Sequence, residues 1–471
     1  MGVALQLDRV ADELFPDLTL GDVRRDRRFR HVVATMAHNP GASLPSIFPN
    51  PSDYHACLDL FDTPECTHAA ILAAHQRAIR RTIEPLTQPL LLIHDTTLFD
   101  YSGHTTLADD LGPIGNGGGR GWMAHQTLVV DPATRVVFGL IGQILHVRVT
   151  PPKDETAAQK RGRESLESRL WVRGLDASGP RPDGAAWVDV ADRGADVFEF
   201  LSARVARGRR FVVRSKHNRA LGTGPTGAKA SQLLHDAVRA VPSRLTRTLA
   251  LPARAGQAKR TAILSVARTR VAVRPPHVRK GRYSKKSLEL TGIRVWEPDP
   301  PVAKPGAETV APLEWFLLTG ESADTPESLA AVVDWYAARM QIEEYHKVQK
   351  SGMGVETLPV QSVAKLGAMV AVLSVIAVAL MNLRLAARDP VVRDRPARNV
   401  VPALWIEVLG IARNRRRVKP LTVLEFWTEL ARLGGYQKNP RTHPPGWITL
   451  WRGWSQLQKL IQYHQSLKKM P

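Results

Sequence analysis

The sequence predicts an α/β protein whose strands lie in the middle of the chain and whose two ends are helical. Short apolar runs that suit buried strands recur between residues 90 and 319, separated by polar segments. Asp131-Pro132-Ala133-Thr134 has the composition of a tight turn between two such runs, which predicts a hairpin. The expected strands cover Leu90–Ile93, Leu128–Val130, Val136–Phe138, Trp187–Ala191, Phe211–Val213, Ile263–Val273, Leu288–Val295 and Trp315–Thr319.

The chain is strongly basic and long enough for several domains. Its 471 residues carry a formal net charge of +21, and hydrophobic residues make up 44% of them, which is ample for real cores. Lys and Arg displace counterions from phosphates, so nucleic acid is the leading partner. The alternative is general basicity from an arginine-rich genome, because Arg outnumbers Lys here.

Cysteine usage and hydropathy indicate the compartment. Cys57 and Cys66 are the only cysteines, which excludes a disulfide scaffold and a cysteine-rich zinc site and suits a reducing cytoplasm. Acidic residues interrupt the start of the chain, so no signal peptide is expected. The apolar run Leu366–Met381 is shorter than the ~18–20 residues of a spanning helix and predicts a buried core helix. We therefore expect a cytoplasmic protein without membrane contact.

Two segments concentrate positive charge. Arg274–Lys286 is rich in Arg, Lys, Pro and Gly and is expected to form an exposed basic loop. Near the start of the chain, five arginines crowd one predicted helix with only Asp26 as a neutralising neighbour. A solvated helix face would explain this run, but the shortage of acids favours contact with phosphates. The five are Arg24, Arg25, Arg27, Arg28 and Arg30.

Two aspartates follow apolar strand runs. Asp95 comes after Leu90–Ile93 and His94, and Asp192 comes directly after Trp187–Ala191. In α/β folds, functional side chains project into a crevice at strand ends. Two carboxylates there suit a hard cation such as Mg²⁺, although many strand-end aspartates simply cap a turn.

A long helix is expected from Pro326 to Lys350, with Gly352 beyond it as a stop signal. Five polar residues on it are separated by 3, 4, 4 and 3 positions and would share one face. An ordinary amphipathic helix with an ion-paired exposed face would look the same. The five are Tyr336, Arg339, Glu343, Lys347 and Lys350.

The spacing of Tyr336, Arg339, Glu343 and Lys350 matches the Tyr-Arg-Glu-Lys signature of one group of DDE transposases. The chain resembles the bacterial Tn-five-like (insertion-sequence-four type) family of these enzymes. Other stretches have counterparts in the same order, so the resemblance covers nearly the whole chain. They are Leu20-Gly21-Asp22 with its following arginines, Ile93-His94-Asp95-Thr96-Thr97, Asp192-Arg193-Gly194-Ala195-Asp196, Phe211-Val212-Val213-Arg214-Ser215-Lys216-His217, Pro312-Leu313-Glu314-Trp315 and Arg432-Leu433-Gly434-Gly435.

The resemblance implies a ribonuclease-H-like catalytic core with a β-rich insertion, flanked by helical N-terminal and C-terminal domains. The expected domains are a DNA-end recognition domain at 1–70, a catalytic domain at 71–364 with its insertion at about 218–312, and a dimerisation domain at 365–471.

The resemblance also implies the site. Asp95, Asp192 and Glu343 would be the catalytic residues and would bind two Mg²⁺ ions, which Mn²⁺ could replace. The enzyme would nick transposon ends, close a DNA hairpin, reopen it and join the 3′ ends to target DNA. Trp315 would stack on an extruded base, with core packing as the alternative. The expected DNA contacts are Tyr336, Arg339, Lys347, Lys350, Arg214, Lys216, Trp315, Arg24, Arg25 and Arg28.

A helix expected at Trp447–Tyr463 carries an apolar stripe at helical spacing. A cut-and-paste enzyme must hold two DNA ends, so we expect a homodimer in the DNA complex, with this stripe as its seam. Packing of the stripe against its own domain is the alternative. The stripe consists of Trp447, Leu450, Trp451, Trp454, Leu457 and Ile461.

Two departures from the family pattern and two other functions stay open. Gly194 replaces the family's Glu in the second motif, and Met340 stands where a second tryptophan is usual. The Met340 departure leaves open how a flipped base is accommodated. The chain could instead be a catalytically inactive end-binding protein or an inhibitor of transposition, which the intact acidic triad argues against. A metal-dependent nuclease without strand transfer would share the triad.

Overall fold

The computed structural model describes residues 10–115, 118–156, 159, 163, 165–182, 184–222, 232–251, 260–276, 286–299, 312–413, 420–437 and 445–468. The chain forms two compact units, each assembled from separated segments. Unit 1 combines Met1–Leu86, Thr96–Glu155 and Gln341–Pro471, and unit 2 combines Thr87–Asp95 and Thr156–Met340. The predicted basic loop Arg274–Lys286 lies largely outside the described residues.

Unit 1 begins with five helices, which confirms the helical expectation for this part of the chain from residue 10 onward. Polar residues cap three of them by accepting a backbone N–H of the first turn: Asp22 before α2, Asn50 before α4 and Thr67 before α5. The helices are α1 (Val10–Leu14), α2 (Val23–His38), α3 (Leu44–Ile47), α4 (Pro51–Leu60) and α5 (His68–Ile83).

A strand hairpin follows in unit 1. β3 (Gly119–Val130) pairs antiparallel with β4 (Val137–His146) and with the short β2 (Gly112–Ile114). The predicted turn is confirmed, because the Asp131 carboxylate accepts the N–H of Ala133 at 2.7 Å and closes it. Both strands extend well beyond the apolar runs from which they were predicted.

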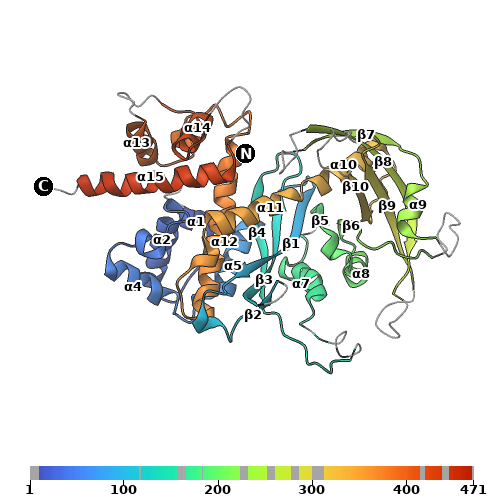
Figure 1. Cartoon of the computed structure of the whole chain (residues 1–471), viewed down its shortest axis with the longest axis horizontal. Coiled ribbons are helices and arrows are strands. Elements are labelled where there is room, and N and C mark those ends of the chain that lie inside the picture. The colour runs from blue at the N-terminus through green and yellow to red at the C-terminus, as the bar shows by residue number, and fades with distance from the viewer. Residues whose placement is uncertain are drawn as a thin grey trace, which may run out of the picture. The chain divides into compact units, whose positions relative to one another are not determined.

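The apolar run near residue 370 forms the central helix of unit 1. α12 (Val363–Ala386) is long and apolar enough to cross a membrane, but 94% of its most apolar window is buried inside the protein. It packs on α5 and β4 (Figure 1). The prediction of a buried core helix is confirmed, although the helix is longer than the run suggested.

The C-terminal helices of unit 1 are α13 (Ala403–Ala412), α14 (Val423–Leu433) and α15 (Trp447–Leu467). The stripe of α15 packs against α13, α14 and the segment around residue 350 in its own unit. Five of its six residues are buried, and Trp451, which is half-buried, lies against Gly352. The prediction that this stripe is a dimer seam is therefore wrong. The aromatic residues of the stripe fill the core of the C-terminal helices.

Unit 2 is built on a mixed sheet with strand order β1-β5-β6-β10-β9-β8-β7. β1 and β6 run parallel to β5, and the remaining neighbours are antiparallel. Helices α7 and α8 lie beside β5 and β6 (Figure 1). The strands are β1 (Leu90–Asp100), β5 (Trp187–Ala191), β6 (Arg210–Arg214), β7 (Leu245–Leu251), β8 (Arg260–Val273), β9 (Leu288–Trp296) and β10 (Glu314–Thr319), and the helices are α7 (Leu170–Ala177), α8 (Phe198–Ala206), α9 (Leu234–Arg239) and α10 (Pro326–Ala337).

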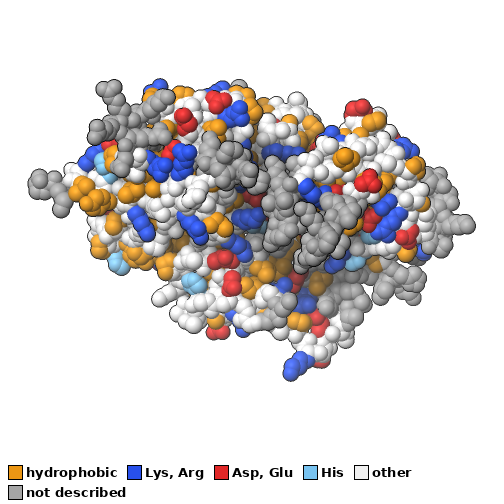
Figure 2. Space-filling view, turned by 45° about the horizontal axis from the view of Figure 1, so that its top comes forward, with side chains coloured by type: hydrophobic (Ala, Val, Ile, Leu, Met, Phe, Trp, Pro, Cys, Tyr) orange, Lys and Arg blue, Asp and Glu red, His pale blue; other side chains and the backbone are white. Residues whose placement is uncertain are grey.

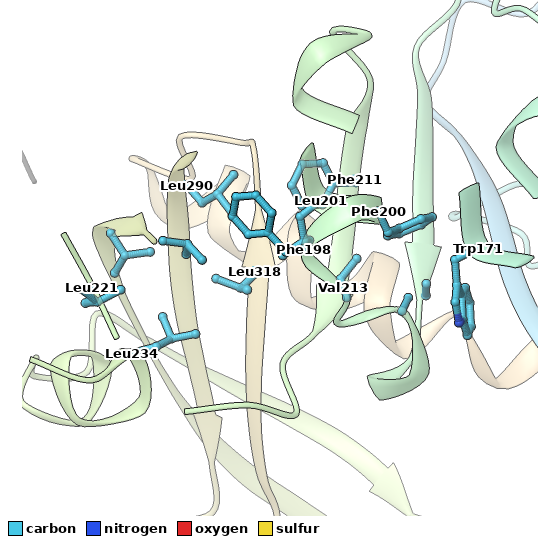
Figure 3. Packing of buried hydrophobic residues seen from close by; sticks show 14 of the residues in the cluster. Trp171, Phe198, Phe200, Leu201, Phe211, Val213, Leu221, Leu234, Leu290 and Leu318 are labelled. Atoms are coloured by element: carbon cyan, nitrogen blue, oxygen red, sulfur yellow. The ribbon is translucent and has the colours of Figure 1, made fainter. Parts of the chain in front are cut away.

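One apolar cluster ties these elements of unit 2 together. Trp171 of α7 and Phe198 and Phe200 of α8 pack with Phe211 and Val213 of β6 (Figure 3). Leucines from α9, β9 and β10 extend the cluster toward the later strands. The cluster also contains Ala191 and Ala195, which flank Asp192, so the backbone around that aspartate rests on a packed core.

The predicted long helix begins as expected but is interrupted. Thr325 caps α10 at Pro326, yet the helix ends at Ala337 and restarts as α11 (Met340–Lys347), followed by a π-helical turn, η5 (Val348–Gly352). At the interruption, the N–H of Arg339 donates to Tyr336 O, three residues back, which tightens the chain locally. The chain passes from unit 2 to unit 1 at this place.

Short helical turns complete the described chain, which is a mixed α/β protein with helical ends. They are η2 (Thr105–Leu107), η3 (Glu167–Arg169), η4 (Arg193–Ala195), η6 (Val355–Thr357) and η7 (Ala397–Asn399).

Candidate functional site

The strand pairing in unit 2 brings two predicted site residues side by side. The parallel pairing of β1 with β5 ends at His94 opposite Ala191, so Asp95 and Asp192 are the next residues on the two strands. Asp192 caps η4, and its Oδ1 accepts the N–H of Gly194 at 2.7 Å. Both aspartates are half-buried. Two carboxylates therefore meet at one edge of the parallel pairing.

Asp95 does not end its strand, contrary to the prediction. β1 continues to Asp100, because Thr96, Thr97, Leu98 and Phe99 are residues that favour a pleated strand. Asp192 does follow the end of β5, as predicted. The Asp95 backbone is thus held within a strand, whereas the Asp192 backbone lies in a turn.

A basic and aromatic group from α10 and the following turn borders the two aspartates. Arg339 Nη1 lies 3.2 Å from Asp95 Oδ2, and the side chains are only 13% and 16% exposed. Burial raises the pKa of the Tyr336 hydroxyl, Asp192 adds to this effect, and Arg214 and Arg339 oppose it. Tyr336 therefore lies within electrostatic reach of all three. The structure brings five of the predicted site residues together within unit 2.

Trp315 is at the margin of the same group. Its ring packs edge-on against Tyr336 with 5.4 Å between centroids, and it is half-buried. Arg214, at the end of β6, donates to the carbonyl oxygen of neighbouring Glu314 at 3.3 Å. Trp315 is thus packed against Tyr336 while remaining partly accessible, and its stacking on an extruded base stays a prediction.

The other signature residues belong to unit 1. Glu343 lies in the first turn of α11. Lys347 is 59% exposed and pairs with Glu344, and Lys350, in the π-helical turn, is 32% exposed and pairs with Glu356, each at 3.1 Å. Tyr336, by contrast, is only 5% exposed. The helix expected to carry all five residues is interrupted between α10 and α11. Because the five residues are divided between the two units, their sharing of one face stays a prediction.

The two aspartates are carboxylate donors of the kind that bind metal ions. Within the described ranges, no group of three or more His, Cys, Asp or Glu side chains is placed to hold one. Asp95 and Asp192 nevertheless supply the carboxylate oxygens that Mg²⁺ prefers, and Mg²⁺ is commonly held by one or two carboxylates, with waters and substrate phosphates completing its shell. The two carboxylates of unit 2 are therefore of the ligand type that a magnesium ion would use.

A buried charge cluster that sequence reasoning missed lies behind the aspartates. Asp189, in the middle of β5, is fully buried and contacts His94, Arg204 and Arg209. Burial alone would raise the pKa of Asp189, but the two guanidinium groups and His94 bring it down to about 2. Burial also lowers the pKa of His94 to about 4, so its ring is neutral near pH 7. In the sequence, the position of Asp189 inside the otherwise apolar run Trp187–Ala191 could have indicated a buried charge with ionic partners.

The surroundings of Gly194 leave no room for a side chain at this position. A Cβ atom at this position would lie 2.8 Å from Cζ2 of Trp171 and 3.0 Å from Oδ1 of Asp192. The Trp171 ring occupies the space into which a longer side chain would extend, and it belongs to the apolar cluster of unit 2. Met340, the second departure, is 41% exposed.

The arginines of α2 form a solvated face with several ion pairs. Arg24 is 90% exposed beside Asp22, whereas Arg25 pairs with Glu65 at 3.0 Å and Arg28 with Asp53 at 3.1 Å. Such exposed pairs contribute little to stability, so a phosphate can replace the carboxylate at small cost. Lys and Arg side chains are spread over the face shown in Figure 2, with acidic residues between them.

Residues 8–66 match a family model described as transposase DNA-binding. The match covers the helices α1–α4 and the arginines of α2. It supports a transposase that binds DNA and thereby indicates a DNA-processing enzyme. DNA is accordingly a partner of this chain.

Proposed function

We propose that this protein is a cut-and-paste DNA transposase of the DDE type, similar to the Tn-five-like family, with a ribonuclease-H-like catalytic core. The observation that carries the proposal is the placement of Asp95 and Asp192 on adjacent parallel strands beside Arg339 and Tyr336. The match of residues 8–66 to a transposase DNA-binding family supports DNA as the substrate. A mixed sheet with acids on its parallel strands is consistent with such a core.

Asp95, Asp192 and Glu343 would hold two Mg²⁺ ions, for which Mn²⁺ can substitute. When bound, the ions lower the pKa of an attacking water or hydroxyl and stabilise charge on the leaving oxygen. The carboxylates are suited to this task because hard cations select oxygen ligands. Glu343 belongs to unit 1, so only its spacing from Tyr336, Arg339 and Lys350 in the sequence supports its role as a third ligand.

The reaction consists of phosphoryl transfers that need no covalent protein intermediate. Water first breaks a P–O bond at the transposon end and leaves a free 3′-hydroxyl. This hydroxyl attacks the opposite strand, which closes a hairpin and releases the flanking DNA. A second water reopens the hairpin, and the 3′-hydroxyls finally attack target DNA. Each step exchanges one P–O bond for another, so no oxidant or reductant is required.

The cationic residues of the site would bind phosphates. Arg339 lies beside Asp95, and Arg214 lies close to Tyr336, so both can neutralise DNA charge that approaches the site. Lys350, Lys347 and Lys216 would add phosphate contacts further along the DNA, and Arg24, Arg25 and Arg28 would bind the terminal repeats. The accessible part of Trp315 would stack on an extruded base, with Tyr336 supporting the ring.

The protein would act as a homodimer on DNA, because excision requires two ends to be held together. The α15 stripe cannot provide the seam, since its residues are already packed within unit 1. The proposed setting is the bacterial cytoplasm, in association with the nucleoid.

A plasmid assay tests the proposal. The substrate carries the two DNA segments that flank this reading frame, placed on either side of a marker. Nicks, hairpins and joined products that appear with Mg²⁺ and disappear with EDTA are the expected result. Retarded DNA without cleavage would instead identify an inactive end-binding protein or inhibitor, and nicks without hairpins or joining would identify a nuclease.

A further inference from the structure

The second motif contains another acid, Asp196, whose carboxylate is fully buried. Its Oδ2 accepts the backbone N–H of Lys216 at 2.7 Å and of His217 at 2.8 Å. Its Oδ1 accepts Nε of Arg219 at 3.1 Å and Nη2 at 2.8 Å. The carboxylate is therefore bound on both oxygens by the turn that follows β6, here called the 215–219 turn.

The 215–219 turn is also held from its other side. Ser215 Oγ lies 3.0 Å from Nε2 of His235, and the side-chain oxygen of Asn218 accepts the N–H of His235 at 2.7 Å. The side chains of Lys216 and His217 are nevertheless exposed. The backbone is fixed at several points while the cationic side chain extends into solvent.

Asp192 and Asp196 lie at the two ends of one short helical turn. Asp192 caps the start of η4 and Asp196 its end, and Ala195 between them is buried in the apolar cluster of unit 2. β5 and β6 are paired up to Ala191 opposite Val213, which brings the chain after each strand to the same sheet edge. One rigid turn thus carries a proposed metal ligand at one end and the anchor of a cationic turn at the other.

We propose that Asp196 is a positioning residue that fixes the 215–219 turn relative to Asp192, so that Lys216 binds a DNA phosphate at a set distance from the cleavage centre. This inference rests on the proposed function. Asp196 itself touches neither DNA nor metal and acts through the two backbone N–H groups and Arg219. Removal of this buried carboxylate would leave the N–H groups that donate to it without an acceptor, which is costly. Asp196 is therefore suited to holding the 215–219 turn in place.

A double-mutant cycle on end binding tests the proposal. Lys216→Ala alone should lower the slope of log K against log salt by about 0.9, the value for one phosphate. In a chain that already carries Asp196→Ala, the same Lys216→Ala change should alter neither the affinity nor the slope. As a matched control, Asp176→Asn removes an exposed acid of unit 2 that pairs with Arg207, and it should leave the Lys216 effect intact.

The outcomes separate the inference from the proposed function. If Lys216→Ala weakens binding equally with and without Asp196, Asp196 is only a stabilising residue and the inference is overturned, while DNA binding by the turn stands. If Lys216→Ala has no effect in the native sequence, both the DNA contact and the inference fail.

A second measurement does not depend on the folding of the Asp196→Ala variant. Hydrogen exchange of the native protein should show slow exchange of the Lys216 and His217 amides, although both residues are exposed. Fast exchange at both amides would mean that Asp196 does not hold the turn, and this would overturn the proposal directly.

Discussion

The inner half of β5 and its solvent end use the same residue type for opposite purposes. Asp189 is fully buried among Arg204, Arg209 and His94, so its charge is neutralised by the protein alone. Asp192, three residues later, is half-buried beside Asp95 and bonds only locally to Gly194 in the contacts described above. The difference teaches that the role of an aspartate depends on which groups neutralise its negative charge. Asp189 is compensated by buried partners within the fold. At the strand edge, Arg339 pairs with Asp95, and it is only in the proposed function that Asp95 and Asp192 also bind a cation from outside.

The sharpest way to break this comparison is to remove the charges of the proposed metal ligands, which are Asp95 and Asp192 at the strand edge and Glu343 on α11. Asp95→Asn, Asp192→Asn and Glu343→Gln should each lower Mg²⁺-dependent nicking more than ~100-fold, because even residues that only support metal ligands cost 10–100-fold. End binding, measured by gel retardation, should persist. Asp110→Asn, an exposed acid of unit 1, serves as the control. Near-normal nicking by any of the three variants would remove that residue from the triad.

Removing the inner charge should instead strongly destabilise the protein. Asp189→Asn leaves Arg204 and Arg209 buried without their counterion, which typically costs about 3–5 kcal/mol. Asp192→Asn should cost much less, because Asn caps a helical turn as well as Asp does. Thermal unfolding followed by circular dichroism distinguishes the two. If both variants lost a similar amount of unfolding free energy, the distinction between Asp189 and Asp192 would be wrong.

Gly194 offers a test of intermediate size. Gly194→Ala places a Cβ against Trp171 and the Asp192 carboxylate, so overpacking of about 1–3 kcal/mol is expected together with reduced nicking. Trp171→Leu in the same chain vacates the space and should restore part of the nicking rate. Without such recovery, the contact with Trp171 would not be the reason for glycine at this position.

The smallest effects concern single phosphate contacts. Arg339→Ala and Lys350→Ala should each reduce the salt slope of end binding by about one phosphate, that is by ~0.9. Arg207→Ala, which removes an exposed arginine that pairs with Asp176, should leave the slope unchanged. Equal slopes for all three variants would support a merely solvated charged face.

Local patterns predicted most of the strands from their apolar runs, but β2 (Gly112–Ile114) and β7 (Leu245–Leu251) were not predicted. The run Trp187–Ala191 coincides with β5, and the cap at Thr325 with Pro326 marks the start of α10. The extension of β1 beyond Asp95 was missed because a polar residue was taken as the strand end. The break in the signature helix depends on a local hydrogen bond at Arg339 that no periodicity reveals.

The contacts of the candidate site were harder to predict, because their partners are distant in sequence. Spacing indicated Arg339 and Asp95 separately but could not show that they form an ion pair. Likewise, Asp53 of α4 and Glu65 in the turn before α5 partly neutralise the α2 arginines. The role of Asp196 could have been suspected from its place in the second motif, yet its bonds to the 215–219 turn require the fold.

The position of α12 in the chain has a consequence for biosynthesis. α12 covers α5 and β4, which are made early, but it is itself made roughly 200 residues later. At ~5–20 residues per second, the ribosome needs about 10–40 s to bridge this interval. During that time the apolar faces of α5 and β4 lack their final cover and depend on chaperones or transient contacts. Completion of unit 1 therefore sets the earliest moment at which a newly made copy can act.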